Sequence, residues 1–289
     1  MTKRFKSQLD VALFNNLNEM FIEKNWVNVI GYESFLEKYY IFLENLNDDE
    51  RALILELTQD YLWITQDSYL RYLVDALTKL EKYEYLNLDK IYIIPLLSKE
   101  DREVGKDKSS KYVSYQCLDI QLSNHPLFAN TVFQRVDNLE HLPKETKIAG
   151  NRNPVILVDD YVGTGETAES ALQELLTIRA YDLQYVFVAS LVAQQIGINR
   201  IVSQGYNFLV SLVRNRGISD KYSPAEATVK KNIMLDLEKR IGVQTKYTLG
   251  YGESEGLITM IRTPNNSFPA YWVEPEDKKW QPPFPRKSR

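Results

Sequence analysis

The sequence predicts an α/β protein in which a domain with a mainly parallel β-sheet follows an all-helical N-terminal module. Over residues 7–86, apolar residues recur at a spacing that places them on one face of a helix. The first such series is Leu9, Leu13, Leu17 and Phe21. After Lys90, short apolar runs alternate with helix-like segments, an order typical of a parallel sheet. We therefore expect a helical module over residues 1–88 and a sheet domain with a C-terminal hood and tail over residues 89–289.

Four helices are expected in the helical module. The second follows Gly31, the third follows the polar residues 47–49, which can cap its start, and the fourth begins near Asp67. We expect their apolar and aromatic stripes to face a core. The stripe of the second helix is Tyr32, Phe35, Leu36, Tyr39, Leu43 and Leu46.

The charge of the helical module argues against DNA binding. Residues 1–90 contain 10 basic and 16 acidic side chains, a net charge of −6, whereas affinity for DNA depends on neutralising phosphates. A lid, a homodimer surface or a docking site for a protein or ribonucleoprotein partner is the better expectation for this module.

The composition of the whole chain excludes several classes of protein. With 289 residues, 44% of them hydrophobic, the chain is long enough for a large core. Its single cysteine, Cys117, permits no internal disulfide, and the expected compartment is a reducing cytoplasm. With only His125 and His141 as histidines, a zinc site is improbable. No apolar run is long enough to span a membrane, and the first residues do not resemble a signal peptide.

The sheet domain should contain at least four buried strands. They are expected at residues 91–97, 155–158, 186–189 and 208–212, with helices at 167–178, 194–203 and 224–241. Right-handed crossovers would then bring the loops after the strands to one edge of the sheet, where ligands bind. Residues 257–262 read as a further strand-like run in the tail.

The most informative segment is residues 155–167, where a buried strand ends in Asp159 and Asp160 and a small-residue turn opens a helix. Such a helix start offers unpaired N–H groups to a phosphate, and Gly163 and Gly165 allow close approach of the backbone. The turn contains no lysine, so it is not a Walker A loop, and it lacks the third glycine of a dinucleotide fingerprint. A sugar phosphate fits, with the carboxylates on two ribose hydroxyls and the turn on the 5′-phosphate.

This segment resembles the phosphoribosyl-pyrophosphate (PRPP) motif of type I phosphoribosyltransferases. That motif has four apolar residues, two acids, two mostly apolar residues and then Thr-Thr-Gly-x-Thr. The match covers residues 155–160, Thr164, Gly165 and Thr167. The sequence departs from the motif at Gly163, where the family often has threonine, and at Glu166, where small residues are usual. We expect the Glu166 side chain to point outward.

A narrower resemblance covers more of the chain. Several segments look like the phosphoribosyltransferase-like family of bacterial conflict (anti-phage) systems, including retron-associated ones. They are the helical front, the loop at residues 159–167, residues 249–254, residues 262–266, Tyr271 with Trp272, and residues 284–286. This resemblance implies a bacterial cytoplasmic effector or nucleotide-handling enzyme.

The resemblance to phosphoribosyltransferases implies a mechanism and its residues. PRPP bound with Mg²⁺ would lose pyrophosphate as a nitrogen nucleophile attacks C1′, through an oxocarbenium-like transition state. Asp159 and Asp160 would be the catalytic residues, would hold the ribose hydroxyls, and would bind Mg²⁺ directly or through water. The PRPP-binding segment would comprise these two with Tyr161, Val162, Gly163, Thr164, Gly165, Glu166 and Thr167.

Two further groups of residues are candidates by position. The polar stretch over residues 98–111 reads as a flexible lid for the leaving pyrophosphate or, equally, as a solvated loop of mixed charge. Its candidates are Arg102, Lys106, Lys108, Ser109 and Ser110. Arg214 and Arg216 follow a strand on the ligand edge and are candidates for the acceptor pocket, with a plain surface loop as the alternative.

Two functions of different classes remain open at this stage. The first is an enzyme that transfers phosphoribose to or from a nucleobase-type acceptor. The second is a non-catalytic regulator that senses PRPP or a nucleotide and docks a partner through its helical front. Both need the same phosphate-binding turn, but only the enzyme must stabilise a leaving pyrophosphate.

Overall fold

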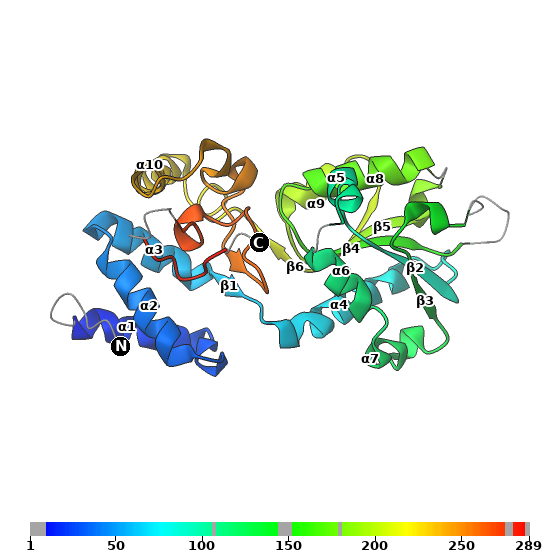
Figure 1. The fold of residues 1–289 in the computed structure, drawn as a ribbon, viewed down its shortest axis with the longest axis horizontal. Coiled ribbons are helices and arrows are strands. Elements are labelled where there is room, and N and C mark those ends of the chain that lie inside the picture. Colours follow the sequence, from blue (N-terminus) through cyan, green and yellow to red (C-terminus); the bar gives the residue numbers. More distant parts are fainter. Residues whose placement is uncertain (1–9, 106–107, 144–151, 179–180, 275–279, 287–289) are drawn as a thin grey trace. The chain divides into compact units, whose positions relative to one another are not determined.

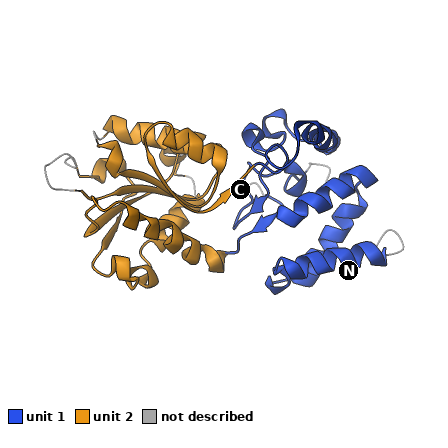
Figure 2. Ribbon diagram, turned by 180° about the vertical axis from the view of Figure 1, so that it is seen from behind, with its two compact units in different colours: residues 1–65, 216–289 blue, residues 66–215 orange. Residues whose placement is uncertain are grey.

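The computed structural model describes residues 10–105, 108–143, 152–178, 181–274 and 280–286. The chain forms two compact units (Figure 2). Unit 1 combines Met1–Thr65 with Arg216–Arg289, and unit 2 is the continuous stretch Gln66–Asn215. The two ends of the sequence therefore belong to the same unit.

Unit 2 contains a parallel sheet of five strands in the order β3-β2-β4-β5-β6. The strands are β2 (Lys90–Pro95), β3 (Val132–Arg135), β4 (Val155–Val162), β5 (Val186–Gln194) and β6 (Asn207–Arg214). The chain starts this sheet at β2, moves outward to β3, and then returns past β2 to β4. In such a doubly wound order the crevice between the first and third strands, at their carboxyl ends, is where ligands bind. The predicted α/β class is confirmed.

Helices cover both faces of this sheet (Figure 1). Helices α4 (Tyr69–Thr78) and α6 (Ser109–Gln116) lie on one face, and α8 (Glu166–Ile178) and α9 (Gln195–Val202) on the other. The short helices α5 (Lys99–Glu103) and α7 (Ile120–Ser123) complete the unit. Because both faces are covered, the inner strands β2, β4 and β5 are mostly buried rather than alternating, and all nine residues of β5 are buried.

Unit 1 is mainly helical and has an aromatic core. Its helices are α1 (Val11–Glu23), α2 (Tyr32–Glu44), α3 (Asp48–Asp60) and α10 (Pro224–Arg240), and a two-residue parallel pair joins β1 (Leu62–Trp63) to β7 (Ile258–Thr259). The described residues of the first two predicted stripes pack inward, and tail residues join them. Leu9, the first residue of the first stripe, lies outside the described residues. Rings that meet in this core include Phe21, Trp26, Tyr39, Phe42, Tyr61, Tyr271 and Phe284. The tail thus completes the core of the N-terminal helices.

Two helix starts follow directly from the sequence. Asn47 caps α3 by accepting a hydrogen bond from the Glu50 N–H, and Glu50 reciprocates by accepting from the Asn47 N–H. Ser223 and Glu226 form the same reciprocal arrangement at the start of α10. The cap predicted at residues 47–49 is therefore correct, because a local side chain satisfies an otherwise unpaired helix N–H group.

The division observed differs from the predicted boundary at residue 88. Residues 66–88 belong to unit 2 because α4 packs its buried Leu73, Ala76 and Leu77 against the sheet unit, where it contacts β5 and β6. Residues 216–289 belong to unit 1 because α10 packs on α3 and the tail enters the aromatic core. The front of the chain is also not entirely helical, since β1 pairs with β7. Packing between segments that are distant in sequence sets the boundary between the units, and the periodicity of a single segment does not predict such packing.

Other differences are smaller. Strand β3 escaped prediction because its four residues alternate between exposed and half-buried positions and form no apolar run. The strand-like run at 257–262 contributes only the two residues of β7. Among the described residues, no helix is long and apolar enough to cross a membrane.

A buried carboxylate fixes the chain within unit 1. The Glu255 side chain, which is fully buried, accepts hydrogen bonds from the Ile218 N–H (2.8 Å) and the Ser219 N–H (2.6 Å). Its other oxygen lies 2.9 Å from Lys231 Nζ of α10. One side chain thereby ties the segment that enters the unit to α10 and to the loop before β7.

We predict that Glu255→Gln destabilises the protein by about 3 kcal/mol, because it leaves the Lys231 ammonium without its buried partner. Chemical denaturation followed by tryptophan fluorescence measures this. The control is Glu253→Gln, two residues away and exposed, which should change the free energy of unfolding by less than about 0.5 kcal/mol. Equal effects of the two substitutions would contradict the anchoring role of Glu255.

Candidate functional site

The segment predicted to carry the chemistry lies at the carboxyl end of β4. Asp159 and Asp160 are in the last half of this strand, which stands between β2 and β5. The β2–β4 pair is the point at which the strand order reverses, and β4 extends beyond the end of β2. The acid pair is therefore at the position where doubly wound sheets bind ligands.

The two carboxyl groups share hydrogen-bond donors from both helices on one face of the sheet. Ser109, the first residue of α6, donates its hydroxyl to Asp160 Oδ1 at 2.7 Å and lies 3.2 Å from Asp159 Oδ1. Tyr69, the first residue of α4, donates to Asp160 Oδ2 at 2.9 Å. Asp159 Oδ1 also accepts from the Asp160 N–H at 2.9 Å. The site is thus built from β4, α4 and α6.

Burial raises the pKa of both carboxyl groups. The pKa of Asp159 lies well above its usual range because of burial first and the neighbouring Asp160 charge second. The pKa of Asp160 is also raised by burial, and the hydrogen bonds from Ser109 and Tyr69 partly offset this. A ligand that brings hydroxyl donors or a cation would favour the ionised forms of both groups.

The turn after β4 is held in close contact with α9. Gly165 has φ +82°, a left-handed conformation, and a Cβ there would lie 3.0 Å from the Gly197 carbonyl oxygen. A Cβ on Gly197 would lie 2.2 Å from the Gly163 carbonyl oxygen. Real Cβ atoms do not approach as closely as 2.2 Å, so α9 can pack on the turn in this way only with glycine at position 197, and at position 165 the left-handed φ favours glycine.

Glu166, the residue that departs from the family motif, is exposed and points to α9. Its carboxylate lies 3.3 Å from Arg200 Nη1, and Arg200 Nε lies 3.9 Å from Glu169 of the same helix α8. The expectation that Glu166 turns outward agrees with this arrangement. Thr164 is buried and Thr167 is exposed.

The predicted lid over residues 98–111 contains α5 and the start of α6, so the described part of it is not a plain loop. Arg102 lies 3.6 Å from Glu174 of α8 and donates to the Leu97 and Asp137 carbonyl oxygens. Lys108 pairs with Asp101 at 3.0 Å. Ser110 is buried, whereas Lys106 lies outside the described residues. Among the candidates that the structure describes, Ser109 is the one whose side chain contacts the acid pair.

The two candidates for the acceptor pocket fall in different units. Arg214 ends β6 in unit 2, and its charge lowers the pKa of Tyr161, although burial raises that pKa more strongly. Arg216 belongs to unit 1, where its guanidinium lies 2.7 Å from Asp220 Oδ1. The assignment of both arginines to an acceptor stays a prediction.

Sequence reasoning missed Tyr69, Gly197 and Arg200. Tyr69 is 91 residues from Asp160, and nothing local to it signals the contact. Gly197 did carry a signal, because a glycine inside an expected helix weakens that helix unless close packing requires it. Arg200 could have been noted as the cation that follows Gly197 by one helical turn.

Residues that could hold Mg²⁺ are present in this site. Mg²⁺ keeps several waters and is usually bound by one or two carboxylates together with substrate phosphates. The adjacent carboxyl groups of Asp159 and Asp160, each with a raised pKa, are such a donor set. Among the residues described, no cluster of three or more His, Cys, Asp or Glu side chains offers an all-protein alternative.

The sequence matches the PRTase-CE family over residues 33–286, which is most of the chain. The chain therefore belongs to the PRTase-CE family, and its fold is type I phosphoribosyltransferase-like. No curated protein matches it.

Two solved structures are similar over about half of the chain. One is a hypothetical protein from Neisseria gonorrhoeae with bound ppGpp, at 16% identity and a TM-score of 0.35, covering 54% of this chain and 85% of that one. The other is the xanthine-guanine-hypoxanthine phosphoribosyltransferase of Helicobacter pylori, at 13% identity and a TM-score of 0.29, covering 53% and 88%.

We predict that Gly197→Ala displaces the turn at residues 163–165 and destabilises the protein by about 1–3 kcal/mol, because its methyl group would overlap the Gly163 carbonyl. Thermal unfolding measures the loss of stability, and amide hydrogen exchange in the turn measures the displacement. The control is Gly242→Ala, because a Cβ there meets nothing within 4 Å, although its φ of +75° adds local strain. Unchanged exchange at residues 163–165 in Gly197→Ala would contradict the proposed packing.

Proposed function

We propose that the protein binds PRPP or a nucleotide together with Mg²⁺ and transfers phosphoribose to or from a nucleobase-type acceptor. The observation that carries this proposal is the adjacent pair of half-buried Asp159 and buried Asp160 directly before a glycine turn that opens α8, at the strand-order reversal of a parallel sheet. Membership of the PRTase-CE family supports it.

The carboxylates would hold the ribose. Two adjacent hydroxyls of a ribose offer two donors, and Asp159 and Asp160 offer carboxylate acceptors on neighbouring residues. Ser109 and Tyr69 donate to Asp160 and fix its orientation, so the pair is positioned before the ligand arrives. Such preorganisation lowers the free-energy cost of binding and of reaching the transition state.

The turn and the start of α8 would hold the 5′-phosphate. The first N–H groups of a helix have no partner within that helix, and the helix dipole adds positive potential there. Gly163 and Gly165 let the backbone come close to the phosphate oxygens. Arg200 offsets the negative charge that Glu166 and Glu169 bring to this helix start.

The ribose ring gains positive charge as its bond to pyrophosphate breaks. An ionised Asp159 or Asp160 next to the ring would stabilise this charge in a site largely removed from water. Mg²⁺, when bound, would neutralise charge on the pyrophosphate. Lys106, Lys108 and Ser110 remain candidates for contacts to the pyrophosphate.

A second function, sensing without catalysis, is favoured by one specific observation. Arg102 and Lys108, two of the cations expected to meet pyrophosphate, are paired with Glu174 and Asp101. A sensor needs the ribose and phosphate contacts but no stabiliser of a leaving group. A role as an effector in bacterial anti-phage defence, and a location in the cytoplasm, stay predictions.

We predict that Asp159→Asn combined with Asp160→Asn weakens Mg²⁺·PRPP binding by about 100-fold or more, because two charge-assisted hydrogen bonds to the ribose are lost. Isothermal titration calorimetry measures the affinity. The matched control is Asp48→Asn with Asp49→Asn, an adjacent acid pair exposed on α3, which should bind like the wild type. Unchanged affinity in the Asp159/Asp160 variant, with its thermal unfolding intact, would refute the site assignment.

The enzyme and the sensor differ in a product that can be measured. We expect the wild-type protein, incubated with Mg²⁺, PRPP and a panel of nucleobases, to release pyrophosphate with at least one base. We also expect a Lys108→Ala variant to release it more slowly, because a lysine that contacts the pyrophosphate would stabilise the further negative charge that develops on it as its bond to C1′ breaks. Tight PRPP binding without pyrophosphate release for any base would favour the sensor.

A further inference from the structure

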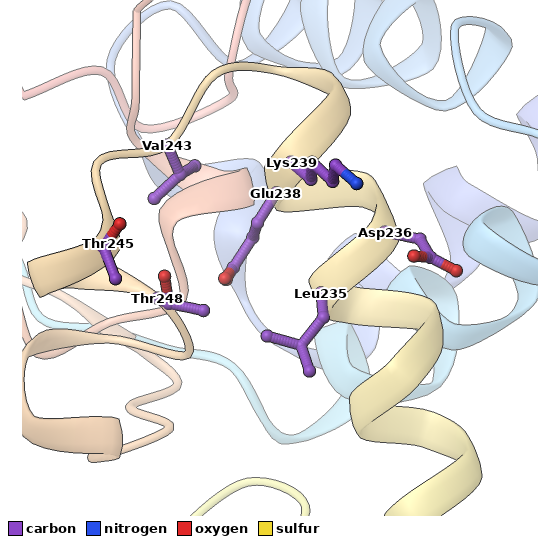
Figure 3. Close-up of a pocket in the computed structure, with 7 residues that line it drawn as sticks. All are labelled: Leu235, Asp236, Glu238, Lys239, Val243, Thr245 and Thr248. Atoms are coloured by element: carbon purple, nitrogen blue, oxygen red, sulfur yellow. The ribbon is translucent and has the colours of Figure 1, made fainter.

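Unit 1 contains a cavity that the proposed phosphoribosyl chemistry does not use. It lies beside the C-terminal half of α10 and the single 3₁₀ turn η7 (Thr245–Tyr247), and its volume is about 340 Å³. This volume is within the range of small-molecule sites. Its lining residues are Leu235, Asp236, Glu238, Lys239, Val243, Thr245 and Thr248 (Figure 3).

The carboxyl group of Glu238 is the unusual feature of this cavity. Glu238 is only 1% exposed, and its Oε2 accepts a hydrogen bond from the Leu249 N–H at 2.9 Å. Within the described part of the chain, its other oxygen, Oε1, has no hydrogen-bond partner. Figure 3 shows the side chain extending from α10 toward Thr248. A buried polar atom without a partner is rare in native proteins and requires an explanation.

The protonation state of Glu238 determines whether its unpartnered Oε1 can donate a hydrogen bond. Burial raises the pKa of Glu238 to about 8, so the neutral acid predominates at pH 7. Asp236 and Lys239, of opposite charge, are the charged residues that line the cavity with it. Since Oε2 already accepts from Leu249, the proton is best placed on Oε1, which can then donate to a ligand.

The loop that follows this cavity is strained. Five of the seven residues from Leu249 to Glu255 have positive φ, among them Leu249 at +54°, Glu253 at +50° and Glu255 at +48°. Non-glycine residues rarely adopt this conformation, and such strain gathers at ligand-binding sites. The Leu249 N–H donates a hydrogen bond to Glu238, and this bond fixes the first residue of the strained loop. The same Glu238 side chain carries the unpartnered oxygen.

The rest of the lining indicates an uncharged ligand with both apolar and polar parts. Leu235 and Val243 offer apolar contacts, and Thr245 and Thr248 offer hydroxyl groups that donate or accept. The charges of Asp236 and Lys239 cancel, so the lining does not select a strong anion or cation. Nitrogen heterocycles combine apolar ring faces with acceptor and donor atoms at their edges.

We propose that this cavity binds a neutral nitrogen heterocycle of nucleobase size, with Glu238 Oε1 donating a hydrogen bond to a ring nitrogen or carbonyl oxygen. The site lies within unit 1, whereas the acid pair and the turn before α8 lie within unit 2. The proposal therefore does not depend on PRPP binding.

Ligand-observed NMR with the full chain tests this, with adenine, hypoxanthine and uracil as probes in the absence of PRPP. We expect at least one probe to bind the wild type and to bind Glu238→Gln within about threefold, because the glutamine amide still accepts from Leu249 and donates to the ligand. Glu238→Leu should weaken binding by at least about tenfold, since it removes the donor.

A second variant keeps the test valid if Glu238→Leu fails to fold. Thr245→Trp fills the cavity without changing Glu238 and should abolish binding. Thr228→Trp is the control and should not abolish it, because Thr228 is an exposed position on α10, the helix that also contains Glu238. Retained binding in the Asp159→Asn/Asp160→Asn variant would separate this site from the phosphoribosyl site. The proposal is overturned if no probe binds the wild type, or if Glu238→Leu and Thr245→Trp bind as the wild type does.

Discussion

Two adjacent carboxyl groups in the last half of a central strand, half-buried Asp159 and buried Asp160, are the constraint on which unit 2 depends. Like charges on neighbouring residues destabilise each other, and burial adds to the cost of ionising them. The fold reduces this cost with hydroxyl donors from the first residues of two helices, Tyr69 of α4 and Ser109 of α6. Both helices must therefore begin at the edge of the sheet where Asp159 and Asp160 lie. Ribose hydroxyls would add further hydrogen-bond donors to these two carboxylates, and a divalent cation would balance their charge.

A second constraint is the close approach of two backbones at the other face of the sheet. The turn at residues 163–165 fits against α9 only because Gly197 lacks a side chain. One turn further along α9, Arg200 pairs with Glu166 and Glu169 at the start of α8. Helix α9 thus positions the turn sterically and balances its charge. This arrangement explains how the chain accommodates a glutamate where the phosphoribosyltransferase motif usually has a small residue.

Unit 1 is built from two segments that are far apart in the sequence, Met1–Thr65 and Arg216–Arg289. Aromatic side chains from α1, α2 and the tail form one core, and buried carboxyl groups fix the segments around α10. Glu255 has donors on both oxygens, whereas Glu238 has a donor on only one. The first is satisfied by the fold itself, and the second is suited to a ligand. Four of the 19 tyrosines of the sequence, Tyr39, Tyr40, Tyr61 and Tyr271, are buried in this core.

The sequence by itself determined the features that depend on neighbouring residues. The parallel α/β class, the strand that ends in Asp159 and Asp160, the glycine turn into α8 and the cap at Asn47 all follow from local pattern, because periodicity and capping act over a few residues. Only the tertiary structure decided which segments share a core and which side chains meet. The boundary between the units, the donors Tyr69 and Ser109 on Asp160, the glycine contact at Gly197 and the unpartnered oxygen of Glu238 depend on burial and on contacts between residues distant in sequence. Such contacts form only when the whole chain packs; a local pattern can mark a residue such as Gly197, but it does not identify the residue that Gly197 contacts.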